Sequence, residues 1–147
     1  HYPATKVEIS APEELLMIPM DIILIEQVLI NLMENAVQHG KTTTKIDLRL
    51  KQDGAFAVFS VSDDGQGIAK ELLPHLFDGY LTRDQEEISD QRRNMGIGLS
   101  VCKSIVQAHG GTMRAENLRS GGAQLRFTLP LEGNSYENQR EDPSDRG

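Results

Sequence analysis

The stretch from Gln27 to Gly40, QVLINLMENAVQHG, indicates the fold of this chain because it combines an apolar helical stripe with an ordered row of carboxamides. Spacings of three and four residues predict a helix with one face in a hydrophobic core, and the apolar residues that show them are Ile25, Val28, Leu29, Leu32, Met33 and Ala36. On its polar side Gln27, Asn31 and Asn35 follow one another four residues apart. Asparagine is a mediocre helix former, so helix propensity does not explain why two of them lie in the interior of this segment.

This polar row has two interpretations. One is an ordinary solvated helix face, with Glu34 and Gln38 alongside the carboxamides. The other is a site for a hard cation and phosphate oxygens, because Mg²⁺ prefers oxygen ligands. A neutral asparagine carbonyl can hold such a cation without adding negative charge that would repel a triphosphate. The stretch alone does not decide between them.

Length and composition limit the class of protein. The chain has 147 residues, which suits one domain with its own core, assigned here to residues 1–132. A net charge of −7, with both signs mixed along the chain, argues against nucleic acid or an anionic membrane surface as a partner. The single cysteine, Cys102, rules out an intrachain disulfide, fits a reducing compartment, and lies in an apolar context that indicates packing.

The apolar segments and the two ends of the chain predict its solubility and its place in a longer protein. The longest apolar stretch, Leu15 to Ile25, is interrupted by Pro19 and is too short to span a bilayer, so we expect a soluble piece. No signal-like segment precedes His1, so we expect a fragment of a longer protein. Residues 133–147 are polar and lack an apolar anchor, which predicts a disordered tail.

Periodicity and turn signals predict the other elements. Alternating segments predict strands at Lys6 to Ser10, Leu15 to Ile18, Thr44 to Lys51, Ala55 to Ser62, Thr112 to Glu116 and Ala123 to Leu129. Turn residues predict hairpins at Asp53-Gly54 and Ser120-Gly121-Gly122. Helices are expected from Asp21, as N-cap, to His39, with Gly40 ending it, then over Lys70 to Phe77 and over the apolar stripe from Leu99 to Ala108.

Two glycine-containing segments are candidate ligand sites. The second central strand runs into Asp63-Asp64-Gly65-Gln66-Gly67-Ile68, where a carboxylate at a rigid strand end can accept a hydrogen bond from an amino group. The segment from Gly96 to Leu99 reads as the entrance of a helix, where free N–H groups attract phosphate. Between them, residues 78–95 form a polar segment without periodicity, which predicts either a functional segment, such as a lid, or disorder. Each signal alone is weak.

In this order, the segments resemble the ATP-binding catalytic domain of bacterial sensor histidine kinases over nearly the whole chain. The matching motifs are the N box (residues 31–36), the G1 box (63–68), the F box (77–80) and the G2 box (96–99). Three segments are most similar in sequence to those of the osmosensitive potassium-channel sensor kinases: LINLMENAV, CKSIVQAHGG and the GGA ahead of TLP. The resemblance implies a two-layer α/β sandwich of the GHKL (Bergerat) type, with a mixed sheet of about five strands and helices on one face.

The resemblance also implies a role for each motif residue. Asn35 would coordinate Mg²⁺, Asn31 would assist it as the second catalytic residue, and Asp63 would accept the adenine amine. Gly65 and Gly67 would admit the base, and the amides of Gly96 and Gly98 would meet the triphosphate. The remaining residues implied at the ATP site are Gln38, His39, Ile68, Phe77, Tyr80, Ile97, Leu99 and, on the last strand through water, Thr128.

Three positions depart from the family pattern. Gln38 stands where a Lys or Arg often pairs with phosphate, His39 where an aromatic ring often packs on adenine, and Asn94 where the G2 box commonly has its first glycine. These departures put affinity in question more than binding itself. Three arginines lie in or near the predicted lid, at Arg83, Arg92 and Arg93. They either supply the positive charge that Gln38 lacks or are ordinary solvated side chains of a charged loop.

The function expected from the resemblance is transfer of the γ-phosphate of ATP to a histidine on a separate dimerisation domain, which later passes it to a response regulator. None of the four histidines of this chain has the helical setting of such an acceptor. We therefore expect a monomeric kinase domain, cytoplasmic within an inner-membrane parent. The alternatives are a GHKL ATPase, a serine-kinase switch protein of the anti-sigma type, and a degenerate nucleotide-binding regulatory module.

Overall fold

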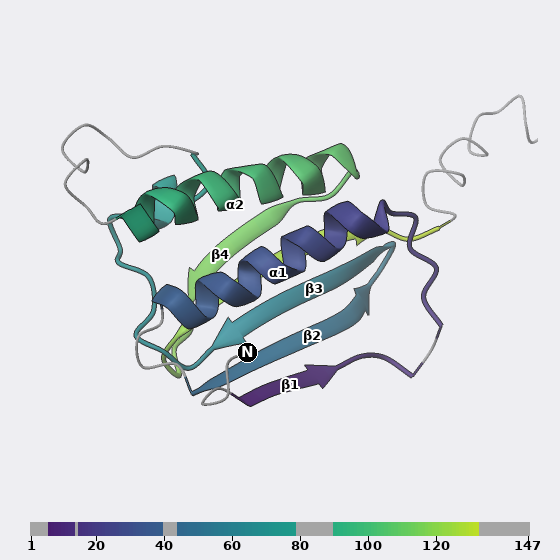
Figure 1. The fold of residues 1–147 in the computed structure, drawn as a ribbon. Helices are drawn as coiled ribbons and strands as arrows, with labels where there is room; N and C mark the ends of the chain where they lie inside the picture. Colours follow the sequence, from purple (N-terminus) through teal and green to yellow (C-terminus); the bar gives the residue numbers. More distant parts are fainter. Residues whose placement is uncertain (1–5, 14, 40–43, 79–89, 133–147) are drawn as a thin grey trace, which may run out of the picture.

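A computed structural model describes residues 6–13, 15–39, 44–78 and 90–132, excluding the side chains of residues 38–39 and 90–97. Two helices, α1 (Ile22–His39) and α2 (Asp90–Ala108), lie side by side on one face of a five-stranded sheet (Figure 1). The strands are β1 (Lys6–Ser10), β2 (Lys45–Asp53), β3 (Phe56–Asp63), β4 (Met113–Asn117) and β5 (Ala123–Pro130), and a 3-10 turn, η1, spans Leu73–His75. The predicted two-layer α/β sandwich is confirmed.

The sheet has the order β1-β2-β3-β5-β4, so β3 is its central strand, as predicted. β1 runs parallel to β2, and the other neighbours are antiparallel, which makes the sheet mixed. The predicted hairpin turn between β2 and β3 is present, with Gly54 at a φ of 60° that other residues rarely adopt. The sheet order brings the end of β3 next to the start of β5, although the two are distant in sequence.

The core lies between the helices and one face of the sheet. The predicted stripe of α1 faces it, with Ile25, Val28, Leu32 and Ala36 buried. Because side chains alternate along a strand, β3 and β5 each send every second residue into the same layer. Phe59 and Phe127 stack there with their ring centroids 4.7 Å apart. Cys102 of α2 is fully buried in the same core, which confirms that it packs rather than reacts.

Two predicted elements differ from the structure. Leu15 to Ile18 is not a strand: Leu16 and Ile18 pack against the core in alternation, but the segment pairs with no neighbouring strand among the described residues. Burial of every second residue therefore arises here without a hydrogen-bonded ladder. Lys70 to Phe77 is not an α-helix but contains only the 3-10 turn Leu73–His75, with Pro74 inside it.

The beginning of α2 is also different from the prediction. The helix begins at Asp90 instead of near Leu99, so Gly96 and Gly98 lie inside it and not at its entrance. The sequence from Asp90 to Asn94 is polar and has no apolar stripe, so periodicity could not detect this turn, although Gln91, Arg92 and Arg93 are good helix formers. The rest of the expected lid, residues 79–89, the predicted helix end at Gly40 and the tail 133–147 lie outside the described residues.

A histidine joins the start of α1 to the end of α2, at the end of the sandwich away from Gly96 and Gly98. Asp21 caps α1 as predicted, because its Oδ1 accepts hydrogen bonds from the amides of Ile23 and Leu24 at 3.1 and 3.2 Å. The Asp21 amide donates to Nε2 of His109 at 3.0 Å, and Nδ1 of that ring donates to the carbonyl of Ile105 at 2.8 Å. His109 therefore carries its proton on Nδ1 and joins the start of α1 to the end of α2.

Candidate functional site

The predicted site residues gather at one end of the sandwich. The carboxyl ends of α1 and β3, the beginning of α2 and the turn between β4 and β5 all lie at the left of Figure 1. Antiparallel pairing of β5 with β3 and with β4 brings that turn beside the end of β3. Four segments far apart in the sequence therefore surround the same place.

Asn31, on the polar side of α1, is held at both ends of its carboxamide. Its Oδ1 accepts a hydrogen bond from Nε2 of Gln27 at 3.2 Å, and its Nδ2 donates to Sγ of Cys102 at 3.4 Å. Burial raises the pKa of the Cys102 thiol, so the sulfur stays a neutral acceptor. The predicted row of carboxamides is therefore a hydrogen-bonded arrangement that fixes the orientation of Asn31.

Asn35, one turn further along α1, is in the opposite situation. Its Oδ1 is buried and has no hydrogen-bond partner among the described residues. Buried polar atoms are almost always paired, because an unpaired one costs about 1–3 kcal/mol. A solvated helix face does not contain such an atom, so the structure favours the ligand interpretation of this position over the solvated one.

Asp63, at the end of β3, is a buried carboxylate with one oxygen in use. Its Oδ1 accepts from the amides of Gly65 at 2.9 Å and Ala123 at 3.4 Å, whereas Oδ2 has no hydrogen bond to a described residue. Burial raises the pKa of Asp63, the two amides oppose that shift, and the neighbouring charge of Asp64 adds to it. A free oxygen on a fixed carboxylate is suited to accept a hydrogen bond from an amine.

Asp64, the next residue, is exposed and has a structural role. Its carboxylate accepts from the amide and hydroxyl of Thr44 at 2.9 and 2.7 Å, and from the amide of Lys45 at 3.1 Å. These hydrogen bonds, chiefly the one from the Thr44 hydroxyl, lower the pKa of Asp64. Asp64 thus fastens the end of β3 to the start of β2, while its neighbour Asp63 is left to face the site.

The segment after Asp64 is clamped by a residue that sequence reasoning missed. Asn117, at the end of β4, accepts from the amide of Ile68 through Oδ1 at 2.7 Å and donates to the carbonyl of the same residue through Nδ2 at 2.8 Å. Gly67 has a φ of 83°, and a Cβ there would lie 2.9 Å from Oδ1 of Asn117. This glycine is required by the clamp, and only the tertiary structure reveals the partner.

The G2 segment meets the N box through Gly98. A Cβ built at Gly98 would lie 3.9 Å from Nδ2 of Asn31, so the two motifs are adjacent. Leu99 is buried in the core and anchors α2 rather than facing a ligand. Within a helix each amide pairs with the carbonyl four residues earlier, so in this conformation Gly96 and Gly98 do not offer the free amides that were predicted.

Phe77 of the F box is partly buried against the core, with Nζ of Lys103 5.7 Å from its ring centroid. Its position fits the anchoring of the segment that follows. Tyr80 and the side chains of Gln38, His39 and Ile97 lie outside the described residues.

Thr128 is not brought to this group, which corrects the prediction that it reaches the same ligand. It pairs with Val58 in the register of β3 and β5, five residues before Asp63 on β3. Its neighbours Phe127 and Leu129 point into the core, so Thr128 points to the opposite face of the sheet. Ala123, whose amide bonds Asp63, is the β5 residue that reaches the site.

The oxygen atoms available at this site suit a hard cation that takes most of its ligands from phosphates and water and few from the protein. Among the described residues no cluster of three His, Cys, Asp or Glu side chains could hold a metal ion by itself. The unpaired carbonyl oxygen of Asn35 suits Mg²⁺, which usually takes one or two protein oxygens and fills the rest of its octahedron with phosphates and water. The unpaired Oδ2 of Asp63 supplies the complementary acceptor for an amine.

Comparison with known proteins identifies the family of this chain. Residues 20–133 match the model described as histidine kinase-, DNA gyrase B- and HSP90-like ATPase. Sensor protein KdpD of Clostridium acetobutylicum is 44% identical over 127 residues, which cover 86% of this chain and 14% of that protein. Sensor protein KdpD of Escherichia coli is 35% identical over the same shares. The chain therefore spans about a seventh of the length of these relatives.

Solved structures show the same architecture. The catalytic domain of histidine kinase ThkA, in a nucleotide-free form, superposes with a TM-score of 0.71 at 29% identity, covering 86% of this chain and 79% of that one. The ATP binding domain of PrrB from Mycobacterium tuberculosis gives a TM-score of 0.69 at 25% identity, covering 88% and 82%. Among the described residues no helix is long and apolar enough to cross a membrane.

Proposed function

The chain belongs to the family of histidine kinase-, DNA gyrase B- and HSP90-like ATPases, and we propose that it is the ATP-binding catalytic domain of a sensor histidine kinase. In this proposal it binds Mg-ATP and donates the γ-phosphate to a histidine on a separate dimerisation domain. Two relatives named sensor protein KdpD each cover 86% of this chain, and the matched region is only 14% of their own length. That share is consistent with the acceptor lying elsewhere in the parent protein.

The observation that carries the proposal is the buried, unpaired Oδ1 of Asn35. An unsatisfied carbonyl in the interior is a cost that a bound cation would remove. Mg²⁺, when bound, would neutralise the charge of the phosphates, and transfer would then depend on alignment and electrostatics. Asn35 would hold the metal, and Gly98 lies close enough to the same carboxamide row for a triphosphate to be shared between α1 and α2.

Adenine would be recognised by Asp63. The carboxylate is fixed by the amides of Gly65 and Ala123, which leaves Oδ2 to accept the exocyclic amine. Gly65, Gly67 and Ile68 would form the wall beside the base, with the clamp from Asn117 keeping that wall in place. The other proposed nucleotide contacts are Gln38, His39, Phe77, Tyr80, Gly96 and Ile97.

Transfer to a histidine is favoured over hydrolysis by the identity of residue 31. GHKL ATPases typically carry a glutamate one turn before the metal-binding asparagine, where it activates water. A carboxamide cannot act as a general base at neutral pH. Both polar atoms of Asn31 are occupied, by Gln27 and by Cys102, which fits a positioning group better than a base. We therefore expect slow hydrolysis.

The similarity to the KdpD proteins suggests which signal the parent protein senses. We propose that the parent protein is a sensor kinase of potassium or osmotic signals, with a response regulator as the final acceptor. The domain would act on the cytoplasmic side of a membrane-bound parent and be monomeric by itself. No nucleic-acid partner is proposed for the chain, whose net charge is −7.

Calorimetric titration with a non-hydrolysable ATP analogue and Mg²⁺ tests nucleotide binding. We expect saturable binding by the wild-type chain and a loss of at least roughly tenfold in affinity in Asp63→Asn, since a charged hydrogen bond contributes about 1.5–3 kcal/mol. Asp47→Asn is the matched control, because Asp47 lies on the opposite face of the sheet and pairs with Arg49. Equal affinities in the two variants would contradict the role of Asp63.

Transfer is tested by supplying the histidine-bearing domain of a KdpD relative in trans with radiolabelled ATP. Label on that domain supports the kinase. Binding of the analogue without transfer would instead support a degenerate nucleotide-binding module, and rapid release of phosphate without transfer would support an ATPase.

A further inference from the structure

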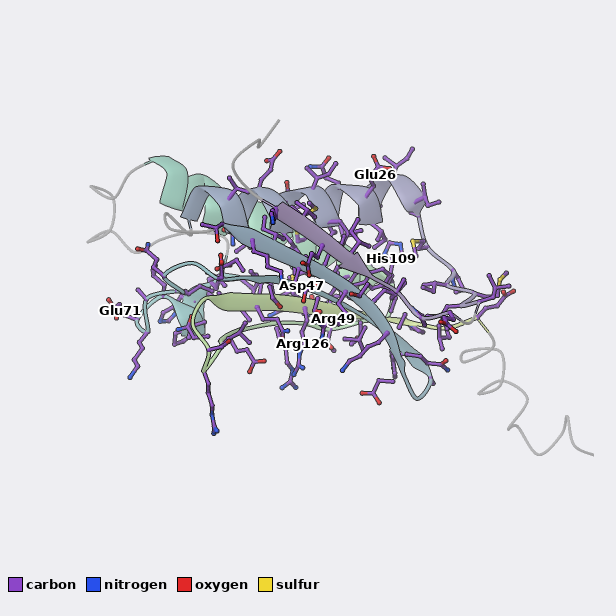
Figure 2. All side chains as sticks on the ribbon, turned by 90° about the horizontal axis from the view of Figure 1, so that it is seen from below. Glu26, Asp47, Arg49, Glu71, His109 and Arg126 are labelled. Atoms are coloured by element: carbon purple, nitrogen blue, oxygen red, sulfur yellow. The ribbon has the colours of Figure 1, made fainter. Side chains whose placement is uncertain are left out.

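The face of the sheet away from the helices carries a group of cations that the proposed nucleotide site does not use. Figure 2 shows Arg49 and Arg126 on this side, opposite the helical layer that bears Glu26. Residues directly opposite one another in register share a face, so Arg49, Ser60, Arg126 and Arg114 form one row across β2, β3, β5 and β4. The row lies on the outer face, as does Thr128.

A cavity of about 190 Å³ lies beside this row. Its walls come from β2, β3, β5 and the start of β4, and they include the cations Lys51, Arg114 and Arg126. Asp53 is its only carboxylate, and Thr112, Thr128 and Val58 complete the lining. Three cations and one anion leave the lining with a net positive charge, although the chain as a whole is at −7.

Within the residues that the structure describes, two other cations of the sheet take part in ion pairs, whereas the three cations of the cavity do not. Lys45 pairs with Glu8 at 3.1 Å and Arg49 with Asp47 at 2.8 Å. Lys51, Arg114 and Arg126 have no ion pair within the described part of the chain. Three cations without an ion pair to a described residue therefore line one cavity on this face.

Arg114 and Arg126 are also placed directly across from each other on adjacent strands. Like charges at such positions destabilise a sheet, and nothing in the fold of β4 and β5 requires arginine at either position. An anion between the two guanidinium groups would turn this repulsion into two attractive contacts. Guanidinium groups bind phosphate-type oxyanions in a forked geometry, which makes them suited to this ligand.

The two threonines of the cavity have a hydroxyl hydrogen to spare. The hydroxyl oxygens of Thr112 and Thr128 are 3.2 Å apart, so one donates to the other. The amide of Thr112 donates to Oγ1 of Thr128 at 3.1 Å, which uses an acceptor position and no hydroxyl hydrogen. Two hydroxyls have two hydrogens, and the described contacts use one, so the other is available to a ligand oxygen.

We propose that this cavity, named here the outer-face pocket, binds a small phosphate-type oxyanion carrying more than one negative charge. Lys51, Arg114 and Arg126 supply the charge, and the free hydroxyl hydrogen of the threonine pair supplies a neutral donor. The concave shape, the single acidic wall residue Asp53 and the net charge of the chain favour a small anion over an extended membrane surface. The pocket lies on the opposite face of the sheet from Asn35 and Asp63 and does not depend on the proposed kinase activity.

Calorimetric titration of the chain with inorganic pyrophosphate, in metal-free buffer at constant ionic strength, tests the proposal. Omitting divalent ions keeps the probe out of the proposed metal-dependent site. We expect saturable binding that weakens at least roughly tenfold in Arg126→Gln and in Arg114→Gln, because each removes a charge-assisted contact. Arg119→Gln is the matched control, since Arg119 is exposed in the turn between β4 and β5 and does not line the pocket.

The melting temperature of each variant shows whether a loss of pyrophosphate binding comes from a folding defect. Removing one of two facing like charges is expected to leave the melting temperature of the free protein unchanged or raise it, and pyrophosphate should raise it in the wild type and in Arg119→Gln only. An equal response of all variants to pyrophosphate would overturn the proposal, as would the absence of any response in the wild type. Sedimentation of the wild type with anionic phosphatidylglycerol vesicles, without a pyrophosphate response, would point to a membrane surface instead.

Discussion

At the scale of single residues, Asn31 and Asn35 show how the same side chain takes two roles one helical turn apart. Asn31 has partners for both polar atoms, in Gln27 and Cys102. Asn35 has a buried oxygen with none among the described residues. A residue that costs folding free energy without a compensating contact is retained for something that binds to it. Asn35 is therefore the residue where stability and function should oppose each other.

Replacing Asn35 with leucine, a residue of similar size, tests this opposition. The variant should be more stable than the nucleotide-free wild type by up to about 1–3 kcal/mol, because the unpaired carbonyl is removed from the interior. It should also lose Mg²⁺-dependent nucleotide binding. Chemical denaturation and calorimetry measure the two effects. Gln27→Leu, an equivalent change in the same row at an exposed position, should not produce the gain; a less stable Asn35→Leu would contradict the prediction.

At the scale of elements, the beginning of α2 is helical although its sequence contains two glycines, which disfavour a helix. Glycine in a helix interior costs about 0.5–1 kcal/mol relative to alanine, and α2 includes both Gly96 and Gly98. Its first two turns are therefore only marginally helical. If phosphate is to meet free amides at these glycines, as proposed, the helix must begin later in the nucleotide-bound protein than Asp90, where it begins here.

Gly98→Ala tests whether α2 changes its beginning. The nearest atom to a Cβ at this position is 3.9 Å away, so alanine fits without a clash. We expect the free protein to gain up to about 1 kcal/mol and the nucleotide to bind more weakly, because alanine stabilises the helical form that hides the amides. Circular dichroism during titration provides the second measurement: nucleotide should reduce helix content in the wild type. Unchanged helix content on saturation would mean that the amides act from within the helix.

At the scale of the whole molecule, the neighbouring carboxylates Asp63 and Asp64 act on the free energy of unfolding in opposite directions. The pKa of Asp64 is lowered by the Thr44 contacts, so its stabilisation is present above its unfolded value of about 3.9 and is lost as pH falls through the lower folded value. The pKa of Asp63 is raised by burial. Its contribution is therefore favourable when protonated and is lost as pH rises through the raised folded value.

Asparagine at each position separates the two effects. In Asp64→Asn, stability at neutral pH should fall, and the acid-induced decrease below about pH 4 should become shallower. In Asp63→Asn, stability at neutral pH should hold or rise, because the carboxamide oxygen can still accept the Gly65 amide without the cost of a buried charge. Urea denaturation across the acid range measures both. The same sign of change in the two variants at neutral pH would contradict this assignment.

Much of the fold could be predicted because local sequence carries it. The stripe of α1, the Asp21 cap, the hairpin at Gly54 and the alternation of β3 and β5 each depend on residues close together in the chain. The chemistry of Asn35 and Asp63 was also visible, as residue types at fixed spacing. The predictions of secondary structure that failed concern segments whose local pattern did not match their conformation: Leu15 to Ile18, Lys70 to Phe77 and the beginning of α2.

The sequence by itself determined the family architecture and pointed to the residues that we propose to face a nucleotide, since periodicity and motif order are properties of the chain. Only the tertiary structure decided which atoms remain available. It paired Asn31 with Cys102, left Oδ1 of Asn35 and Oδ2 of Asp63 without a partner in the described part of the chain, and placed Asn117 as the clamp on Ile68. It also turned Thr128 away from the site by strand alternation. Hydrogen-bond satisfaction depends on contacts between residues distant in the chain, and these exist only once the sheet order is formed.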